Sequence, residues 1–313
     1  MERFNKQRDY IIIAGPTAGG KSAYALALAE ALDGIIINAD SMQVYSDLSV
    51  LTARPSPADE ARVEHCLYGE IDGAIRFSAG MWLETARAHI QAVRKKEKWP
   101  ILVGGTGFYL RAAEAGLSAI PDVPDATRQS VIAEHSEKGG QAMLAQLSAF
   151  DPEIASRLEA GDSQRIIRAV EVYRHTGISL STFQKQPPSG GLQGKALKIT
   201  HLPAREIIYQ RIETRLDEMM ATTAQEEVRQ LLGRKLPDDL PVMKALGVRP
   251  LRDHFEGKQT LEEAIYLAKR DTRHYAKRQM TWFRNNFITN LLNEELYSKR
   301  NFEEFFSKIL KII

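Results

Sequence analysis

The sequence has little that could cross-link the chain, secrete it or anchor it. It contains a single cysteine, Cys66, so no internal disulfide can form, and we expect a protein of the reducing cytoplasm. No apolar run approaches the roughly eighteen residues that a membrane span needs, so we expect no membrane contact. The first ten residues, MERFNKQRDY, are polar and charged, and we expect no secretion signal there. These absences predict a globular protein held together by its own core.

An excess of charge of one sign is also absent. The 42 lysines and arginines nearly balance the 40 aspartates and glutamates, which gives a net charge of +2. Whole-chain charge therefore does not indicate a nucleic-acid-binding protein, and any basic surface must be local. With 43% hydrophobic and 26% charged residues, the composition excludes disordered, collagen-like and coiled-coil chains. A length of 313 residues predicts one large domain or two modest ones.

Three apolar runs of strand length alternate with helical patterns in the first third of the chain. The runs are YIIIAG at 10–15, IIINAD at 35–40 and ILVGGTG at 101–107. Residues 21–32 are rich in alanine and leucine, and residues 82–98 show helical spacing with a basic last turn. This alternation predicts an α/β fold, with a P-loop NTPase-like parallel sheet flanked by helices.

The pattern changes near Pro121. From there to about residue 185 no convincing strand occurs, and short helical segments end in polar residues or glycine. We expect residues 1–120 to form the first part of a core, 121–190 an all-helical insertion, and 191–313 the second part of the core with a basic C-terminal helix. In that last part we expect a strand at 197–202 and helices at 205–220, 225–232 and 260–286.

The segment GPTAGGKS matches the phosphate-binding pattern G-x-x-x-x-G-K-[ST]. It follows a buried strand and begins a helix, which is the context that this motif requires. Backbone N–H groups at a helix N-terminus attract an anionic phosphate, Lys21 adds a mobile cation, and the Ser22 hydroxyl is a suitable Mg²⁺ ligand. The predicted phosphate-binding residues are therefore Gly15, Pro16, Thr17, Ala18, Gly19, Gly20, Lys21 and Ser22.

One part of an ordinary P-loop phosphotransferase is missing. Such enzymes hold their magnesium with an aspartate at the end of a strand. The best candidate strand, at 101–107, ends in glycines and Thr106 instead, and only Asp40 supplies a carboxylate in a comparable position. This pattern favours a polyphosphate chemistry other than ordinary ATP-dependent transfer.

Six further segments, in the same order, closely resemble the tRNA isopentenyltransferase family in its bacterial form. The resemblance spans roughly residues 10–287, and the last 25 or so residues carry no family signal. The segments are NADSMQVY at 38–45, TARP at 52–55, GGTGFYLRA at 104–112, DSQRIIRAVEVYRHTG at 162–177, RIETRLDEMM at 211–220 and YAKRQMTWFR at 275–284.

The resemblance implies an alkyl transfer. The five-carbon group of dimethylallyl diphosphate would move to the exocyclic N6 amine of the adenosine on the 3′ side of the anticodon. The tRNAs would be those that read codons beginning with U. The implied partners are the tRNA anticodon stem-loop and dimethylallyl diphosphate, the implied cofactor is Mg²⁺, and we expect a monomer. The phosphate loop would then hold a diphosphate leaving group rather than ATP.

The resemblance also assigns catalytic roles to individual residues. Asp40 would accept the proton of the amine, which as a weak nucleophile benefits from a general base. Thr17 matches the family residue near the reacting carbon, and Arg111 and Arg215 match the arginines that contact the diphosphate. Helical spacing gives separate support for Arg215, which falls on an apolar stripe where a buried guanidinium needs an anion.

RNA-contacting residues follow from the same resemblance and, at the C-terminal helix, from helical spacing. In the helix at 260–286, we expect a solvent-facing basic stripe of Arg270, Arg273, Lys277 and Arg284. The opposite face, which includes Tyr275 and Gln279, is mostly apolar and is expected to pack on the core. The expected tRNA-binding residues are Asp40, Ser41, Met42, Gln43, Thr106, Arg128, Gln164, Arg165, Ile166, Ile167, Arg168, Arg270, Arg273 and Lys277.

Three other functions remain open at this point. An isopentenyltransferase acting on free AMP shares the phosphate loop and the aspartate, but it needs no long basic helix. A P-loop small-molecule kinase explains GPTAGGKS and leaves the later segments unexplained. A GTPase-like switch or RNA-binding module lacks support because no N-K-x-D motif occurs. His65 and Cys66, which replace a family His-His pair, receive no role.

Overall fold

The structure, a computed structural model, describes residues 8–313. Residues 1–7 lie outside the described residues. They include most of the polar start of the chain, where we expected no secretion signal, and they begin the predicted segment 1–120. The chain divides into two compact units. One, the core unit, runs to Glu114 and resumes from Leu192 to Ile313, and the other, the helical unit, is Ala115–Gly191.

A six-stranded sheet forms the centre of the core unit. Its strand order is β3-β2-β4-β1-β5-β6, and every neighbouring pair runs parallel. This confirms the predicted α/β fold with a parallel sheet. The two outer strands were not predicted, because segments of two and three residues show no periodicity. The strands are β1 (Tyr10–Ala14), β2 (Gly34–Asn38), β3 (His65–Cys66), β4 (Trp99–Gly104), β5 (Ala196–His201) and β6 (Leu291–Asn293).

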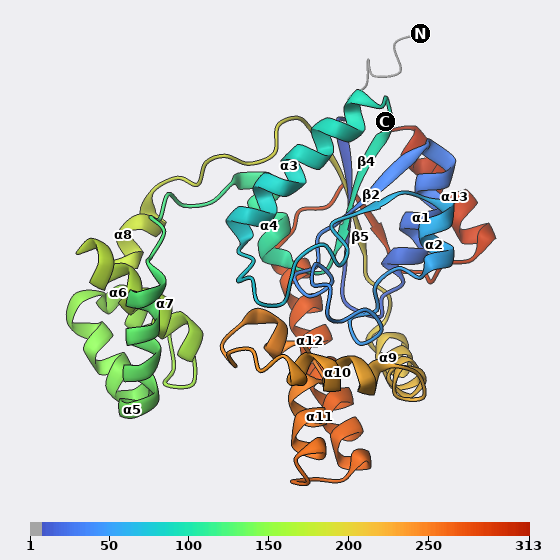
Figure 1. The fold of residues 1–313 in the computed structure, drawn as a ribbon. Helices are drawn as coiled ribbons and strands as arrows, with labels where there is room; N and C mark the ends of the chain where they lie inside the picture. Colours follow the sequence, from blue (N-terminus) through green and yellow to red (C-terminus); the bar gives the residue numbers. More distant parts are fainter. Residues whose placement is uncertain (1–7) are drawn as a thin grey trace. The chain divides into compact units, whose positions relative to one another are not determined.

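Helices cover both faces of this sheet. Figure 1 shows α1, α2 and α13 on one side and α3 and α4 on the other. No helix between residues 8 and 313 is both long and apolar enough to cross a membrane. The core-unit helices are α1 (Lys21–Leu32), α2 (Pro57–Arg62), α3 (Ala79–Lys95), α4 (Gly107–Ala115), α9 (Arg205–Met220), α10 (Ala224–Gly233), α11 (Val248–Phe255), α12 (Leu261–Asn286) and α13 (Lys299–Leu310), with a 3-10 turn at Pro241–Lys244.

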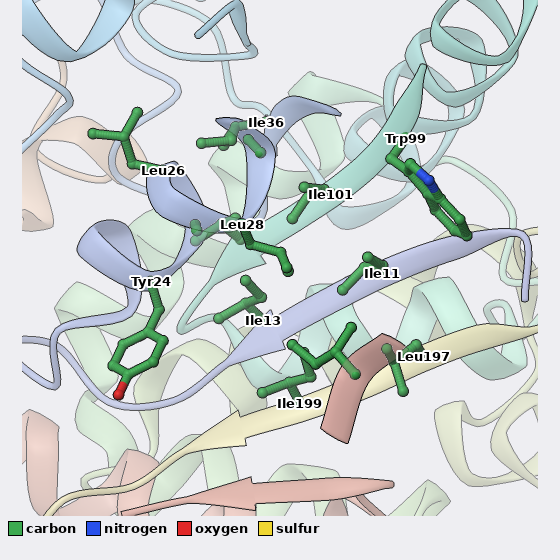
Figure 2. Packing of buried hydrophobic residues seen from close by; sticks show 14 of the residues in the cluster. Ile11, Ile13, Tyr24, Leu26, Leu28, Ile36, Trp99, Ile101, Leu197 and Ile199 are labelled. Carbon is green, nitrogen blue, oxygen red and sulfur yellow. The ribbon is translucent and has the colours of Figure 1, made fainter. Parts of the chain in front are cut away.

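One apolar core lies between α1 and the sheet. Figure 2 shows Leu28 of α1 beside Ile13 of β1 and Ile101 of β4, with Ile199 of β5 on the next strand. Burying each such side chain contributes about 1.5–3 kcal/mol. Phe305 of α13 belongs to the same cluster, so part of the last 25 residues completes this core.

Close backbone contacts bring the carboxyl ends of the strands together. A Cβ atom at Gly104, where β4 ends, would collide with the carbonyl oxygen of Ala39, just after β2. A Cβ atom at Gly15, just after β1, would collide with the carbonyl oxygen of His201 in β5. Glycine at these two positions lets the loops after β1, β2 and β4 meet at one edge, where parallel α/β sheets bind ligands.

The helical unit has a small core of its own. It consists of α5 (Asp125–Phe150), α6 (Pro152–Ala155), α7 (Ser163–Thr176) and α8 (Leu180–Lys185), and α5 is interrupted at Gly139, which has a φ of 77°. The rings of Phe150 and Tyr173 stack with their centroids 3.9 Å apart. Its buried side chains include Val131, Met143, Leu147, Ile154, Ile166, Val170, Val172, Leu180 and Phe183.

A buried ion pair ties α5 to α7 inside the helical unit. The carboxylate of Glu171 is only 1% exposed and accepts hydrogen bonds from Arg128, at 2.8 and 2.5 Å, and from Arg168, at 2.7 Å. Burial alone would raise the pKa of Glu171, but the two guanidinium groups outweigh it and hold that pKa below its ordinary value. The carboxylate is therefore charged and stabilises the packing of the two helices.

Replacing Glu171 with Gln should destabilise the protein by about 2–3 kcal/mol, somewhat below the full cost of breaking a buried pair because both arginines retain contact with water. Since the folded-state pKa is depressed, the contribution of the carboxylate is fully present above the unfolded pKa of about 4.3 and is lost as pH falls through the lower folded pKa. Urea unfolding at several pH values measures both effects.

Glu153 provides a matched control. It also pairs with two cations, Arg157 and Lys185, but on the surface. Glu153→Gln should change the free energy of unfolding much less than Glu171→Gln does, because water and salt screen an ion pair on the surface. Equal effects of the two substitutions would contradict the buried-pair account.

Candidate active site

The phosphate loop connects β1 to α1. Gly20 takes a left-handed conformation, with a φ of 91°, immediately before the first residue of α1. The side chain of Lys21 turns back over the loop, where its Nζ donates a 2.7 Å hydrogen bond to the carbonyl oxygen of Pro16. The ammonium group therefore lies above the loop that would surround a phosphate.

Burial lowers the pKa values of two basic side chains around this loop. It lowers the pKa of Lys21 to about 8, with Asp40 acting against the shift and Arg215 adding to it. It also lowers the pKa of His201 to about 4, with Lys21 and Arg211 adding to the shift. His201 is therefore neutral near pH 7, while most of Lys21 is charged.

Two arginines of α9 reach the same loop. Nη2 of Arg215 donates a 2.8 Å hydrogen bond to Oγ1 of Thr17, and Nε of Arg211 donates one of 2.8 Å to the carbonyl oxygen of Ala18. Burial lowers the pKa of Arg215 to about 10, Arg211 lowers it further, and Asp40 opposes both. Nε of Arg215 is buried and has no hydrogen-bond partner among the described residues. A guanidinium with a buried, unpaired N–H beside two further cations has the chemistry that suits an anion.

Asp40 lies on the turn that follows β2, and Asn38 fixes this turn. The side-chain Oδ1 of Asn38 accepts the N–H of Asp40 at 2.8 Å, while its Nδ2 donates to the carbonyl oxygen of Asp40 at 3.0 Å. One carboxylate oxygen of Asp40 accepts the N–H of Met42 at 2.9 Å. In the part of the chain that the structure describes, the other oxygen accepts no hydrogen bond and is available to a ligand.

Thr106, at the head of α4, borders the Asp40 turn. Its Oγ1 accepts the N–H of Ser41 at 2.9 Å and lies 3.2 Å from the Ser41 hydroxyl. Tyr275 of α12 completes this side of the site: burial raises its pKa, the charge of Asp40 adds to the rise, and a hydrogen bond with Thr106 opposes it. Asp40, Thr106 and Tyr275 therefore lie together.

Gln43 follows in the same loop with its amide group fixed. Its Nε2 donates to the carbonyl oxygens of Thr52 and Ala53, at 3.0 and 2.7 Å. Glu227 of α10 braces this turn by accepting the N–H groups of residues 50–51, at 2.8 and 3.1 Å. Because both amide hydrogens of Gln43 are used, its side chain offers only an acceptor to a ligand.

The basic face of α12 differs from the expected stripe. Arg273 forms an ion pair with Glu213 of α9, so the prediction that it faces solvent as part of an open stripe is wrong. Arg270 contacts Asp271 at 2.8 Å. Arg270, Lys277 and Arg284 are exposed as expected, and so is Arg278, which was not placed on the stripe. Lys277 and Arg278 line a surface groove of about 520 Å³ together with His274, Thr281, Trp282 and Asn286.

Other predicted residues lie apart from the loop contacts described above. Arg111 is exposed on α4, and none of the contacts found among residues 8–313 involves its side chain. In the helical unit, Gln164 and Arg165 are exposed, whereas Ile166 is buried and Ile167 packs against the same core. Arg128 and Arg168 are held by Glu171, which limits how freely either could reach an RNA phosphate.

At the N-terminus of α1, Ser22 is the side chain that we expected to bind a metal ion. Its hydroxyl lies beside a cavity of about 280 Å³, whose lining includes Leu26, Tyr68 and Val103. Among residues 8–313 there is no group of three His, Cys, Asp or Glu side chains suited to a metal ion. Mg²⁺ in phosphate sites is held largely by substrate oxygens and water, so a single protein hydroxyl is compatible with such an ion.

Sequence reasoning overlooked three residues of this site. Arg211 stands one helical turn before Arg215, and that i, i+4 spacing could have indicated it. Tyr275 and Gln279 were assigned only to the packed face of their helix, although Gln279 binds the phosphate loop directly. A polar glutamine on an apolar face was the signal available for the latter.

Comparison with known families gives a consistent result. The chain matches the family described as IPP transferase over residues 43–286 and the one described as isopentenyl transferase over residues 8–70. The two ranges together cover the phosphate loop, the Asp40 turn and all of α12.

Individual relatives agree with these families. The chain is 47% identical to the tRNA dimethylallyltransferase of Nitrobacter hamburgensis over 88% of each chain, and 44% identical to that of Rhizobium meliloti over 91% of this chain and 94% of the relative. The solved tRNA isopentenylpyrophosphate transferase of Bacillus halodurans superposes with a TM-score of 0.69 at 31% identity, covering 98% of this chain and 96% of that one. A eukaryotic dimethylallyltransferase acting on tRNA gives a TM-score of 0.73 at 26% identity, covering 91% and 73%.

The lowered pKa of Lys21 predicts a pH-dependent anion site. Above pH about 8 the free lysine loses its proton, so binding an anion there requires proton uptake. The affinity for an organic diphosphate monoester, whose own charge is constant in this range, should fall by up to about tenfold per pH unit above that point. Isothermal titration calorimetry between about pH 7 and pH 9.5 measures this change in affinity.

Lys21→Arg is the control, because an arginine stays protonated over this range. Its affinity should be independent of pH. A wild-type affinity that is equally flat would contradict the assignment of Lys21 as the titrating cation.

Proposed function

Because the chain belongs to the tRNA dimethylallyltransferase family, we propose that it transfers the dimethylallyl group of dimethylallyl diphosphate to the N6 amine of the adenosine on the 3′ side of the anticodon. We further propose that its substrates are tRNAs that read codons beginning with U. A monomer suffices, since all proposed site residues belong to one chain.

One observation carries this proposal: the charge of Asp40 acts on cations at the phosphate loop, so the Asp40 turn lies close to that loop. Asp40 acts on the pKa values of Lys21, Arg215 and Tyr275. A diphosphate held by the two cations would therefore adjoin an amine held at Asp40. Alkyl transfer needs this adjacency, because the leaving group and the nucleophile occupy opposite sides of one reacting carbon.

The proposed reaction breaks the bond between C1 of the dimethylallyl group and the bridging oxygen, and forms a bond from C1 to N6 of adenosine. The electron pair of the broken bond leaves with the diphosphate, which Lys21, Arg211 and Arg215 stabilise. Thr17, oriented by its hydrogen bond from Arg215, contacts the diphosphate beside C1. We propose Arg111 as a further diphosphate contact on the strength of the family resemblance.

The proton released from N6 passes to the free oxygen of Asp40. The hydrogen bonds from Asn38 and from the N–H of Met42 hold the Asp40 turn in place. Ser41, Met42 and Gln43 would line the adenine pocket, and the fixed Gln43 amide offers an acceptor that suits an amino group. A positioned carboxylate that accepts a proton contributes about 10²–10⁴-fold to such a rate.

We propose Mg²⁺ as the cofactor, held by the Ser22 hydroxyl and by oxygens of the diphosphate. When bound, the ion neutralises negative charge on the leaving group. Lys21 and the backbone N–H groups of the loop orient the same group from the protein side.

The tRNA would contact the exposed face of α12, and the helical unit, taken by itself, offers further candidate contacts. Lys277 and Arg278 supply positive charge beside Trp282, in a groove that a free nucleotide would not need. This observation favours tRNA over AMP as the acceptor. Asp271 and Glu213 would compete with an RNA phosphate for Arg270 and Arg273. Gln164 and Arg165 are the exposed candidates in the helical unit.

A substrate comparison tests the proposal. Radiolabelled dimethylallyl diphosphate is offered with tRNA, with AMP and without an acceptor, and ATP is offered separately. Label should enter tRNA alone. Label in AMP would support a free-nucleotide enzyme, and stoichiometric ADP formation would support a kinase; either result would overturn the proposal.

Asp40→Asn should lower the transfer rate by about 10²–10⁴-fold, because it keeps the shape of the side chain and removes the base. The affinity for tRNA should change little, since the backbone turn remains. Single-turnover kinetics measures the rate, and filter binding measures the affinity. Turnover within about threefold of wild type would exclude Asp40 as the base.

Reversing Lys277 and Arg278 to Glu should raise the Michaelis constant for tRNA and reduce the salt slope of binding by roughly one for each phosphate that the protein no longer neutralises. The dissociation constant of dimethylallyl diphosphate should not change. Reversal of Lys308 and Lys311, exposed at the end of the chain, makes the same change in net charge and should leave tRNA affinity unaltered. Equal effects of the two double variants would show that only net charge matters.

A further inference from the structure

Gln279 of α12 joins the two halves of the proposed site. Its Oε1 accepts the backbone N–H of Thr17 at 2.8 Å, and its Nε2 donates to the carbonyl oxygen of Gly105 at 2.8 Å. A single side-chain amide thus bridges the phosphate loop after β1 and the glycine turn after β4. These loops are far apart in the chain and are joined here by a residue from a third element.

The structure makes specific room for this bridge. Gln279 is 5% exposed, on a face whose other members include Ala276, Met280 and Phe283. A Cβ atom at Gly105 would collide with Nε2 of Gln279, so only glycine at this position admits the amide. Burying an amide is costly unless both of its polar ends are satisfied, and an apolar side chain would serve packing equally well.

Each end of the bridge continues into one half of the site. On one side, Thr17 receives the guanidinium of Arg215, which faces the proposed diphosphate. On the other, Gly105 precedes Thr106, whose Oγ1 holds the N–H of Ser41 next to Asp40. The amide of Gln279 therefore fixes the separation between the leaving-group contacts and the base.

We propose that Gln279 is a positioning residue that aligns the allylic carbon with the adenosine amine, an inference that rests on the proposed function. It touches neither substrate, and each substrate keeps its own contacts without it. Its loss should therefore lower kcat by about 10- to 100-fold, because a displacement of about 1 Å in a near-attack geometry has an effect of this order. The Michaelis constants for tRNA and for dimethylallyl diphosphate should stay within about threefold of wild type.

Gln279→Leu tests whether kcat falls while the Michaelis constants hold, and Thr272→Val is the matched control. Thr272 is equally buried on α12, but its hydroxyl bonds only to Ala268 of its own helix. The control should keep a wild-type kcat. The proposal is overturned if Gln279→Leu keeps the wild-type kcat, if its Michaelis constants rise while kcat holds, or if Thr272→Val loses as much kcat as Gln279→Leu.

Gln279→Glu gives a second readout that does not depend on the stability of the first variant. A protonated glutamic acid reproduces both hydrogen bonds, whereas a carboxylate places an acceptor against the carbonyl oxygen of Gly105. Burial raises the pKa of such a carboxyl. The ratio of kcat for this variant to that of wild type should therefore rise as pH is lowered from about 8 to about 6. A ratio that is constant with pH would overturn the proposal.

The proposed function and the role of Gln279 can be refuted separately. Absence of dimethylallyl transfer by the wild-type protein would refute the proposed function. An active wild type together with an unaffected Gln279→Leu variant would refute only the role of Gln279.

Discussion

A concentration of positive charge at one edge of a parallel sheet is the constraint on which this site depends. Lys21, Arg211 and Arg215 converge on the phosphate loop, and burial depresses the pKa values of Lys21 and Arg215. Asp40 is the carboxylate that acts on both of these pKa values. Such an arrangement is costly without a counter-anion, and a bound diphosphate would supply the missing negative charge. This arrangement is the physical basis for proposing that the loop binds a polyanion.

The rest of the core unit serves to bring these groups together. Parallel strands end at the same edge, and glycines at the ends of β1 and β4 allow the following loops to touch. The helices α9 and α12 then close the site from outside the sheet, one supplying the two arginines and the other Gln279 and Tyr275. The same helix α12 exposes Lys277 and Arg278 on its outer face. One helix therefore carries both the proposed RNA surface and Gln279, which binds the phosphate loop.

Sequence patterns predicted the parts of this structure that depend on local signals. The ranges 21–32 and 205–220 agree with α1 and α9, because helix propensity and helical spacing are local signals that the sequence displays directly. Strands β3 and β6 were missed because they are too short to show alternation. The stripe on α12 was placed wrongly at Arg273, since helical spacing cannot show that Glu213 of another helix lies opposite. The contact of Thr17 with Arg215, across 198 positions, could be anticipated only from the family resemblance.

The central claim is that the phosphate loop holds a leaving group whose carbon–oxygen bond breaks. The most direct test places a heavy oxygen isotope in the bridging position of dimethylallyl diphosphate and follows it by mass spectrometry during turnover with tRNA. The account predicts that the label leaves entirely with the released diphosphate, while the modified adenosine contains none. Label retained on the five-carbon product would show cleavage at phosphorus, and would contradict the account.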